Sequence, residues 1–121
     1  MGSFRVPIEV GDLAGHRFER IDALVDTGAT YTWVPQDVLQ RLGLEPEEKR
    51  PFILADGREM YYGVRWVGAR IGGRFTPTIV IFGHPGSEPL LGVVTLEELG
   101  LGADPVNERL ISIPGRLRSV A

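Results

Sequence analysis

The residues best placed for chemistry are Asp26, Thr27 and Gly28, which directly follow the apolar residues 23–25. A carboxylate placed where an apolar strand ends has restricted solvation. Gly28 permits a tight turn that brings its own backbone N–H toward that carboxylate, and the Thr27 hydroxyl can brace the loop from behind. The pattern predicts a loop that holds one carboxylate still. An ordinary Asx turn closing a strand is the alternative.

Other chemistries find little support in the composition. The chain has no cysteine, which excludes disulfides, thiolate metal sites and a cysteine nucleophile. His16 and His84 are isolated, with no second ligand at metal-binding spacing. The serines lie outside any Gly-x-Ser-x-Gly elbow, and no Gly-Lys-Ser/Thr phosphate loop occurs. We therefore expect neither a metal nor a cofactor.

Length and charge narrow the class of protein further. A chain of 121 residues and 13.3 kDa fits one domain, residues 1–121. Its formal charge of -3 makes nucleic acid an unexpected partner. No apolar run approaches the roughly 18 residues of a membrane helix, so we expect no membrane association and a cytoplasmic location.

Glycines and prolines divide the chain into short segments, most of which have the composition of strands. Two short helices are expected, at residues 36–42 and 96–99, the second with a capping box formed by Thr95 and Glu98. The expected strands cover residues 4–10, 18–25, 50–55, 58–67, 66–71, 74–82 and 109–113, and residues 31–34 form a further apolar stretch. The fold class is therefore mostly β, a small closed or sandwich-like barrel.

Two motifs resemble the hallmarks of the aspartic peptidases. Asp26-Thr27-Gly28-Ala29 resembles their active-site loop, and residues 89–92, Pro-Leu-Leu-Gly before a short helix, resemble their second motif. Asp56-Gly57 lies between them, where the family carries a flap hairpin. Only one Asp-Thr/Ser-Gly loop is present, so the chain resembles the single-lobe, retropepsin-like branch, which forms homodimers. The resemblance implies an acid-protease-like closed barrel with a flap.

The resemblance also implies an activity and a set of site residues. It implies an endopeptidase in which Asp26 from each of two subunits activates a water, with peptide or protein as substrate and an acidic to weakly acidic pH optimum. Thr27 would bridge the paired loops. The implied loop and flap residues are Thr27, Gly28, Ala29, Ala55, Asp56, Gly57 and Arg58.

One departure from the viral pattern concerns an ion pair. Retroviral relatives commonly carry Asp at the position of Thr30 and Arg at the position of Val93, and both are missing here. Losing both partners leaves no unpaired buried charge. The chain is therefore expected to lie nearer to cellular and bacterial relatives than to viral ones.

Several alternatives stay open at this point. The main alternative is a noncatalytic peptide- or protein-binding module that uses the same cleft, although the intact motif favours an enzyme. Trp33 is expected in the core, and Trp66 is expected to pack the flap hairpin onto the barrel. Tyr61 and Tyr62 either line the cleft or pack the hairpin. The last strand, residues 109–113, is either an interface between subunits or paired within the chain.

Overall fold

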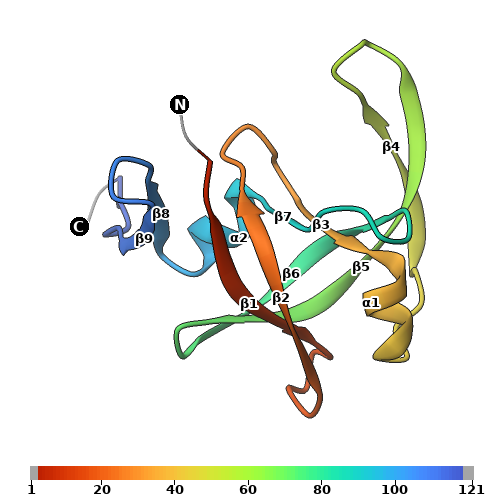
Figure 1. The fold of residues 1–121 in the computed structure, drawn as a ribbon, viewed down its shortest axis with the longest axis horizontal. Coiled ribbons are helices and arrows are strands. Elements are labelled where there is room, and N and C mark those ends of the chain that lie inside the picture. The colour runs from red at the N-terminus through yellow and green to blue at the C-terminus, as the bar shows by residue number, and fades with distance from the viewer. Residues whose placement is uncertain (1–2, 119–121) are drawn as a thin grey trace.

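The computed structural model describes residues 3–118 as a mostly β chain with two short helices (Figure 1). The helices are α1 Gln36–Arg41 and α2 Val93–Glu98. The described strands are β1 Arg5–Gly11, β2 Phe18–Val25, β3 Thr32–Pro35, β4 Glu48–Ile53, β5 Glu59–Ile71, β6 Arg74–Gly83, β7 Leu90–Leu91, β8 Leu101–Asp104 and β9 Arg109–Ser112. The predicted fold class is confirmed.

Six strands pair in a ring in the order β1-β2-β7-β3-β6-β5, and β5 returns to pair with β1. The returning contact joins Gly11 to Gly68 and is flanked by an ion pair between Glu9 and Arg70 at 2.8 Å. Alternate residues of each strand point inward and form one apolar core. Fully buried members of this core include Ile8, Val10, Val34, Val67, Val80 and Leu91.

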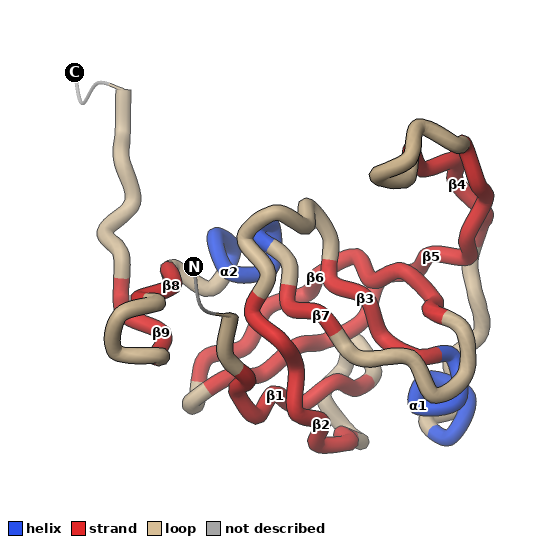
Figure 2. Tube along the Cα trace, turned by 45° about the horizontal axis from the view of Figure 1, so that its top comes forward, coloured by secondary structure: helices blue, strands red, loops and turns tan. Residues whose placement is uncertain are grey.

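Strand β5 is long enough to serve two structures. Its second half belongs to the ring, whereas its first half, Glu59 to Val64, pairs antiparallel with β4. We call β4, this half of β5 and the turn between them the flap hairpin, which extends away from the ring in Figure 2. The prediction of two strands, residues 58–67 and 66–71, was wrong, because the backbone remains paired throughout.

The two-residue strand β7 is inserted between β2 and β3. It runs parallel to β2, with Leu91 opposite Val25, and antiparallel to β3, with Leu90 opposite Trp33. Sequence patterns identified these residues as a motif but not as a strand, because two residues are too few to show alternation. This insertion places β7 directly beside the end of β2.

Helix α2 begins earlier than predicted. Its N-cap is Gly92, which makes no side-chain cap hydrogen bond, and the helix runs over Val93–Glu98 rather than residues 96–99. The expected capping box is therefore wrong. Thr95 instead lies within the helix, fully buried, and its hydroxyl contacts strands β3 and β6.

Strands β8 and β9 form a separate two-stranded sheet after α2. Strand β8 was not predicted, and it gives the last strand a partner within the same chain. Figure 1 shows this hairpin at the side of the ring opposite the flap hairpin. Within residues 3–118, no helix is long and apolar enough to span a bilayer.

Candidate active site

Asp26 lies in the loop that follows β2, and three hydrogen bonds donated by backbone N–H groups shape that loop. The Asp26 N–H donates to the Leu91 carbonyl at 3.1 Å, and the Ala29 N–H donates to the Asp26 carbonyl at 3.0 Å. The Gly28 N–H donates to Oδ1 of Asp26 at 2.9 Å. The predicted approach of Gly28 to the carboxylate is thus present, in the geometry of an Asx turn. The carboxylate is held in place yet only half-buried.

The start of α2 supports the second half of the loop. The N–H groups of Val93 and Val94 donate to the carbonyls of Ala29 and Thr30 at 2.9 and 3.0 Å. Gly92 permits this approach, because a Cβ there would lie 2.5 Å from the backbone carbon of Tyr31. Backbone contacts therefore connect α2 to the loop where viral relatives are expected to use an ion pair.

Three buried threonines form a hydroxyl network beneath the loop. Oγ1 of Thr95 lies 2.6 Å from Oγ1 of Thr32 and 2.8 Å from Oγ1 of Thr78. Oγ1 of Thr32 also accepts the Gly92 N–H at 3.1 Å. All three side chains are at most 1% exposed. The network therefore joins β3, β6 and α2 to Gly92, which lets α2 approach the loop.

Sequence reasoning assigned the bracing role to Thr27 and missed this network. The Thr27 side chain is exposed and forms no hydrogen bond to another described residue. Within one chain the bracing comes from Thr32 instead. The sequence did carry a sign of this role. Thr32 is two residues before the buried Val34 in an apolar strand, so both side chains face the core.

The four residues predicted for the flap lie together in the turn of the flap hairpin. The Gly57 N–H donates to the Leu54 carbonyl at 2.9 Å, with Gly57 at φ 87°. Asp56 accepts the Arg58 N–H at 3.0 Å and its guanidinium at 2.7 Å. These bonds hold the pKa of Asp56 below its ordinary 3.8. Asp56 therefore stays ionised, and the turn intact, in weakly acidic solution.

A pocket of about 280 Å³ lies between the loop and the flap hairpin. No charged side chain lines it. Two aromatic pairs join the flap hairpin to the ring of strands. Tyr31 packs against Phe52 and Trp33 packs against Tyr62, with centroids 6.2 and 5.2 Å apart. The complete lining is Gly28, Ala29, Thr30, Tyr31, Trp33, Phe52, Ile53, Leu54, Tyr62, Ile81 and Leu90.

The positions expected for the tryptophans and tyrosines are confirmed only in part. Trp33 is half-buried and faces the pocket, with its indole N–H bound to the Ser87 hydroxyl at 2.9 Å. Tyr62 lines the pocket, whereas Tyr61 is 63% exposed. Trp66, which was expected to pack the hairpin onto the barrel, is 43% exposed.

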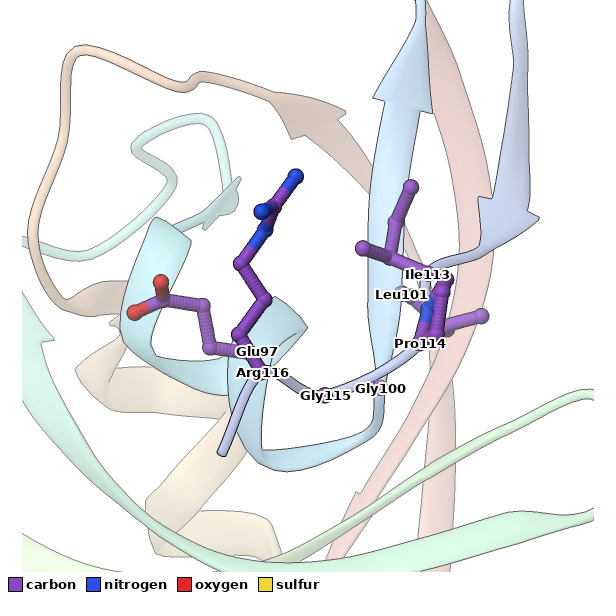
Figure 3. A pocket seen from close by; sticks show the side chains of 7 residues that line it. All are labelled: Glu97, Gly100, Leu101, Ile113, Pro114, Gly115 and Arg116. Atoms are coloured by element: carbon purple, nitrogen blue, oxygen red, sulfur yellow. The ribbon is translucent and has the colours of Figure 1, made fainter. Parts of the chain in front are cut away.

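A larger pocket lies elsewhere in the described chain. It measures about 450 Å³ and is formed between the end of α2 and the segment after β9, as Figure 3 shows. Neither the Asp26 loop nor the flap hairpin contributes to it. Size alone therefore does not identify the candidate site. Among residues 3–118 there is also no group of three His, Asp or Glu side chains arranged for a metal ion.

Comparison with known sequences assigns the family. Residues 13–98 match the family described as "gag-polyprotein putative aspartyl protease". The chain belongs to this aspartyl protease family. Its matched segment contains the Asp26 loop, the flap hairpin and β7. The sequence matches no curated protein.

Solved structures of aspartyl proteases share the fold of this family member. A retropepsin-like aspartic protease from Rickettsia conorii is 21% identical, with a TM-score of 0.57 over 86% of this chain and 94% of that one. The simian foamy virus protease is 23% identical, with a TM-score of 0.52 over 76% and 92% of the two chains. The single-lobe retropepsin-like fold is thus shared with a bacterial and a viral protease.

The hydroxyl network beneath the protease loop predicts a stability difference. Thr95→Val keeps the shape of the side chain but leaves the Thr32 and Thr78 hydroxyls without their shared partner. We expect it to lower the free energy of unfolding by about 1–3 kcal/mol, the usual cost of unsatisfied buried groups. Thr95→Ser keeps the hydroxyl and should cost about 1 kcal/mol, for one lost methyl. Urea unfolding measures both, and a Thr95→Val protein as stable as the wild type contradicts the assignment.

Proposed function

We propose that this family member is an aspartic endopeptidase whose active site forms when two copies bring their Asp26 carboxylates together. The observation that carries the proposal is the Asp26 loop, which holds a half-buried carboxylate and whose residues 28–30 line the pocket shared with the flap hairpin. The sequence contains a single Asp-Thr-Gly, so the second carboxylate comes from another copy. The exposed Thr27 is the residue proposed to bridge the two loops.

The chemistry of a carboxylate pair accounts for the need for two copies. Peptide hydrolysis requires a base that activates water and an acid that protonates the carbonyl oxygen and the leaving amine. Two carboxylates sharing one proton perform both tasks, because like charges at about 3 Å cannot both ionise readily. The pair then titrates in two separate steps that belong to neither residue alone.

An extended peptide is the proposed substrate. Strand β4 pairs only with β5 among the described strands, which leaves its other edge free. A free edge can accept a peptide as an added strand, through backbone hydrogen bonds that are independent of side chains. The neighbouring pocket then receives one substrate side chain. The same features favour peptide binding without cleavage as the second candidate function.

Replacing the proposed catalytic carboxylate separates the two candidates. Asp26→Asn keeps the size and the Asx turn but removes the group that shares the proton. We expect the cleavage of a diverse peptide library to fall by at least about a thousandfold. Asp22→Asn, an exposed change on the same strand, should cleave as the wild type does. Cleavage that survives Asp26→Asn contradicts the mechanism, and binding without cleavage by the wild type favours the binding module.

The shared proton also predicts a pH profile. kcat/KM should be greatest in acidic to weakly acidic solution and fall toward alkaline pH, because the doubly ionised pair lacks the acid. Asp56, whose pKa is lowered by its hydrogen bonds to Arg58, remains charged in weakly acidic and alkaline solution. Initial rates measured between pH 3 and pH 9 at constant ionic strength test this. A rate that rises continuously from pH 5 to pH 9 contradicts a shared proton.

The uncharged lining of the pocket predicts a side-chain preference. A peptide with Leu or Phe at the position that enters the pocket should have a kcat/KM at least about tenfold above that with Asp, because an unpaired charge is costly there. Trp33→Ala should reduce the preference, whereas Trp66→Ala removes an exposed tryptophan outside the lining and should not. Equal cleavage of both peptides contradicts the role of this pocket.

A further inference from the structure

Trp33 forms one wall of the pocket between the Asp26 loop and the flap hairpin. On β3 it lies opposite Ile81 of β6 and Leu90 of β7, and both of these residues line the same pocket. Its ring also packs against Tyr62 of the flap hairpin, with centroids 5.2 Å apart. Whatever holds the indole in place therefore sets the shape of this pocket.

Ser87 binds the indole from outside the pocket. The Nε1–H of Trp33 donates to Oγ of Ser87 at 2.9 Å. The Ser87 hydroxyl in turn donates to the His84 carbonyl at 2.7 Å, and the Ser87 N–H donates to the same carbonyl at 3.1 Å. Because the hydroxyl proton points to that carbonyl, an oxygen lone pair is left for the indole. Ser87 does not line the pocket, so its influence there passes through Trp33.

Gly83 makes room for the indole at the end of β6. A Cβ on Gly83 would lie 2.2 Å from Nε1 of Trp33 and 2.8 Å from Oγ of Ser87. Without a side chain at this position, the indole N–H reaches the hydroxyl across bare backbone. The ring of His84 adds an edge contact to the indole, with centroids 5.9 Å apart. The indole therefore has a defined position against the end of β6.

The loop that carries Ser87 is itself anchored to the barrel. It comprises residues 84–89, between β6 and β7, and lies next to α1, as Figure 1 and Figure 2 show. The Gly86 N–H donates to Oδ1 of Asp37 in α1 at 3.2 Å, and Glu88 pairs with Arg5 of β1. These two contacts flank Ser87 in the sequence. The hydroxyl is therefore presented to the indole from a fixed position.

We propose that Ser87 determines the side-chain preference of this pocket, as a positioning residue that holds the Trp33 indole. The inference rests on the proposed function, in which the pocket receives a side chain of the substrate. A fixed aromatic wall stays in contact with a large apolar side chain, whereas an indole free to rotate loses part of that contact and of the preference it gives. The preferred substrate then carries a side chain such as Phe, rather than Ala, at this position.

The first experiment compares the kcat/KM of two peptides that differ only in having Phe or Ala at the pocket position. Ser87→Ala should lower the Phe/Ala ratio at least about fivefold. The change should arise in KM rather than kcat, because the Asp26 loop keeps its own hydrogen bonds. Ser87→Thr keeps the hydroxyl and should stay within about twofold of the wild-type ratio. Ser112→Ala removes a hydroxyl outside the lining and should leave the ratio unchanged.

A second measurement reports on the indole without any cleavage. The chain has two tryptophans, so Trp66→Phe leaves Trp33 as the only one. In this background, Ser87→Ala should raise the acrylamide quenching constant of Trp33 at least about twofold, because the indole N–H has lost its partner and the ring is free to turn toward solvent. Ser87→Thr should leave the constant unchanged. Thermal unfolding establishes that each variant is folded.

Gly83→Ala displaces the indole while Ser87 stays in place. The added methyl would take the position of Nε1, so the Trp33 ring has to move. We expect the same loss of preference and the same rise in quenching, and this variant decides the question if Ser87→Ala does not fold. Gly115→Ala is the matched control, since a Cβ there meets nothing within 4 Å.

The outcomes separate this inference from the proposed function. If the wild type is active and Ser87→Ala keeps its Phe/Ala ratio, the role of Ser87 is overturned and the peptidase stands. An active wild type that cleaves both peptides equally has the same consequence. Quenching that is unchanged in both Ser87→Ala and Gly83→Ala overturns the positioning of the indole.

An inactive wild type still decides the inference through binding. If it binds the peptides without cleaving them, the ratio of their dissociation constants replaces the ratio of kcat/KM. A binding ratio that falls in Ser87→Ala supports the role of Ser87 and overturns the peptidase, whereas an unchanged ratio overturns both. A wild type that neither binds nor cleaves either peptide also overturns both.

Discussion

The hydrogen bond from the Asp26 N–H to the Leu91 carbonyl joins the carboxylate loop to the strand beneath it, and the rest of the site is built around that bond. Leu91 is fully buried between β2 and β3, so its carbonyl cannot shift without disturbing the core. Gly92 then lets the chain pass beneath Tyr31 and start α2. The buried strands of the barrel thereby fix the position of a half-exposed carboxylate.

The support beneath the loop is made of neutral groups. Thr32, Thr78 and Thr95 share hydroxyl hydrogen bonds within the core, and two N–H groups of α2 bind loop carbonyls. Burying neutral hydroxyls that are all paired costs less desolvation than burying an ion pair. This arrangement accounts physically for the joint absence of charge at Thr30 and Val93. The loop is held without a charged group that would compete with Asp26.

The two sides of the Asp26 loop present different surfaces. On one side, an uncharged pocket and the free edge of β4 suit an extended peptide. On the other side, Arg74 holds the β8–β9 hairpin next to Asp26 and Thr27. The loop therefore has two separate faces, one at the uncharged pocket and one at the β8–β9 hairpin.

The sequence by itself determined the family, the mostly β class, the loop around Asp26 and the hairpin turn at Asp56-Gly57. These follow from local patterns: strand alternation, turn residues and a short motif. Only the tertiary structure decided the start of α2, the pairing of β8 with β9, the exposure of Trp66 and the role of Thr95. Each of these depends on partners distant in the chain, as when Thr95 binds Thr32 and Thr78 across 63 and 17 residues. Thr95 has the local signature of a helix cap, but those distant hydroxyls hold it inside the core.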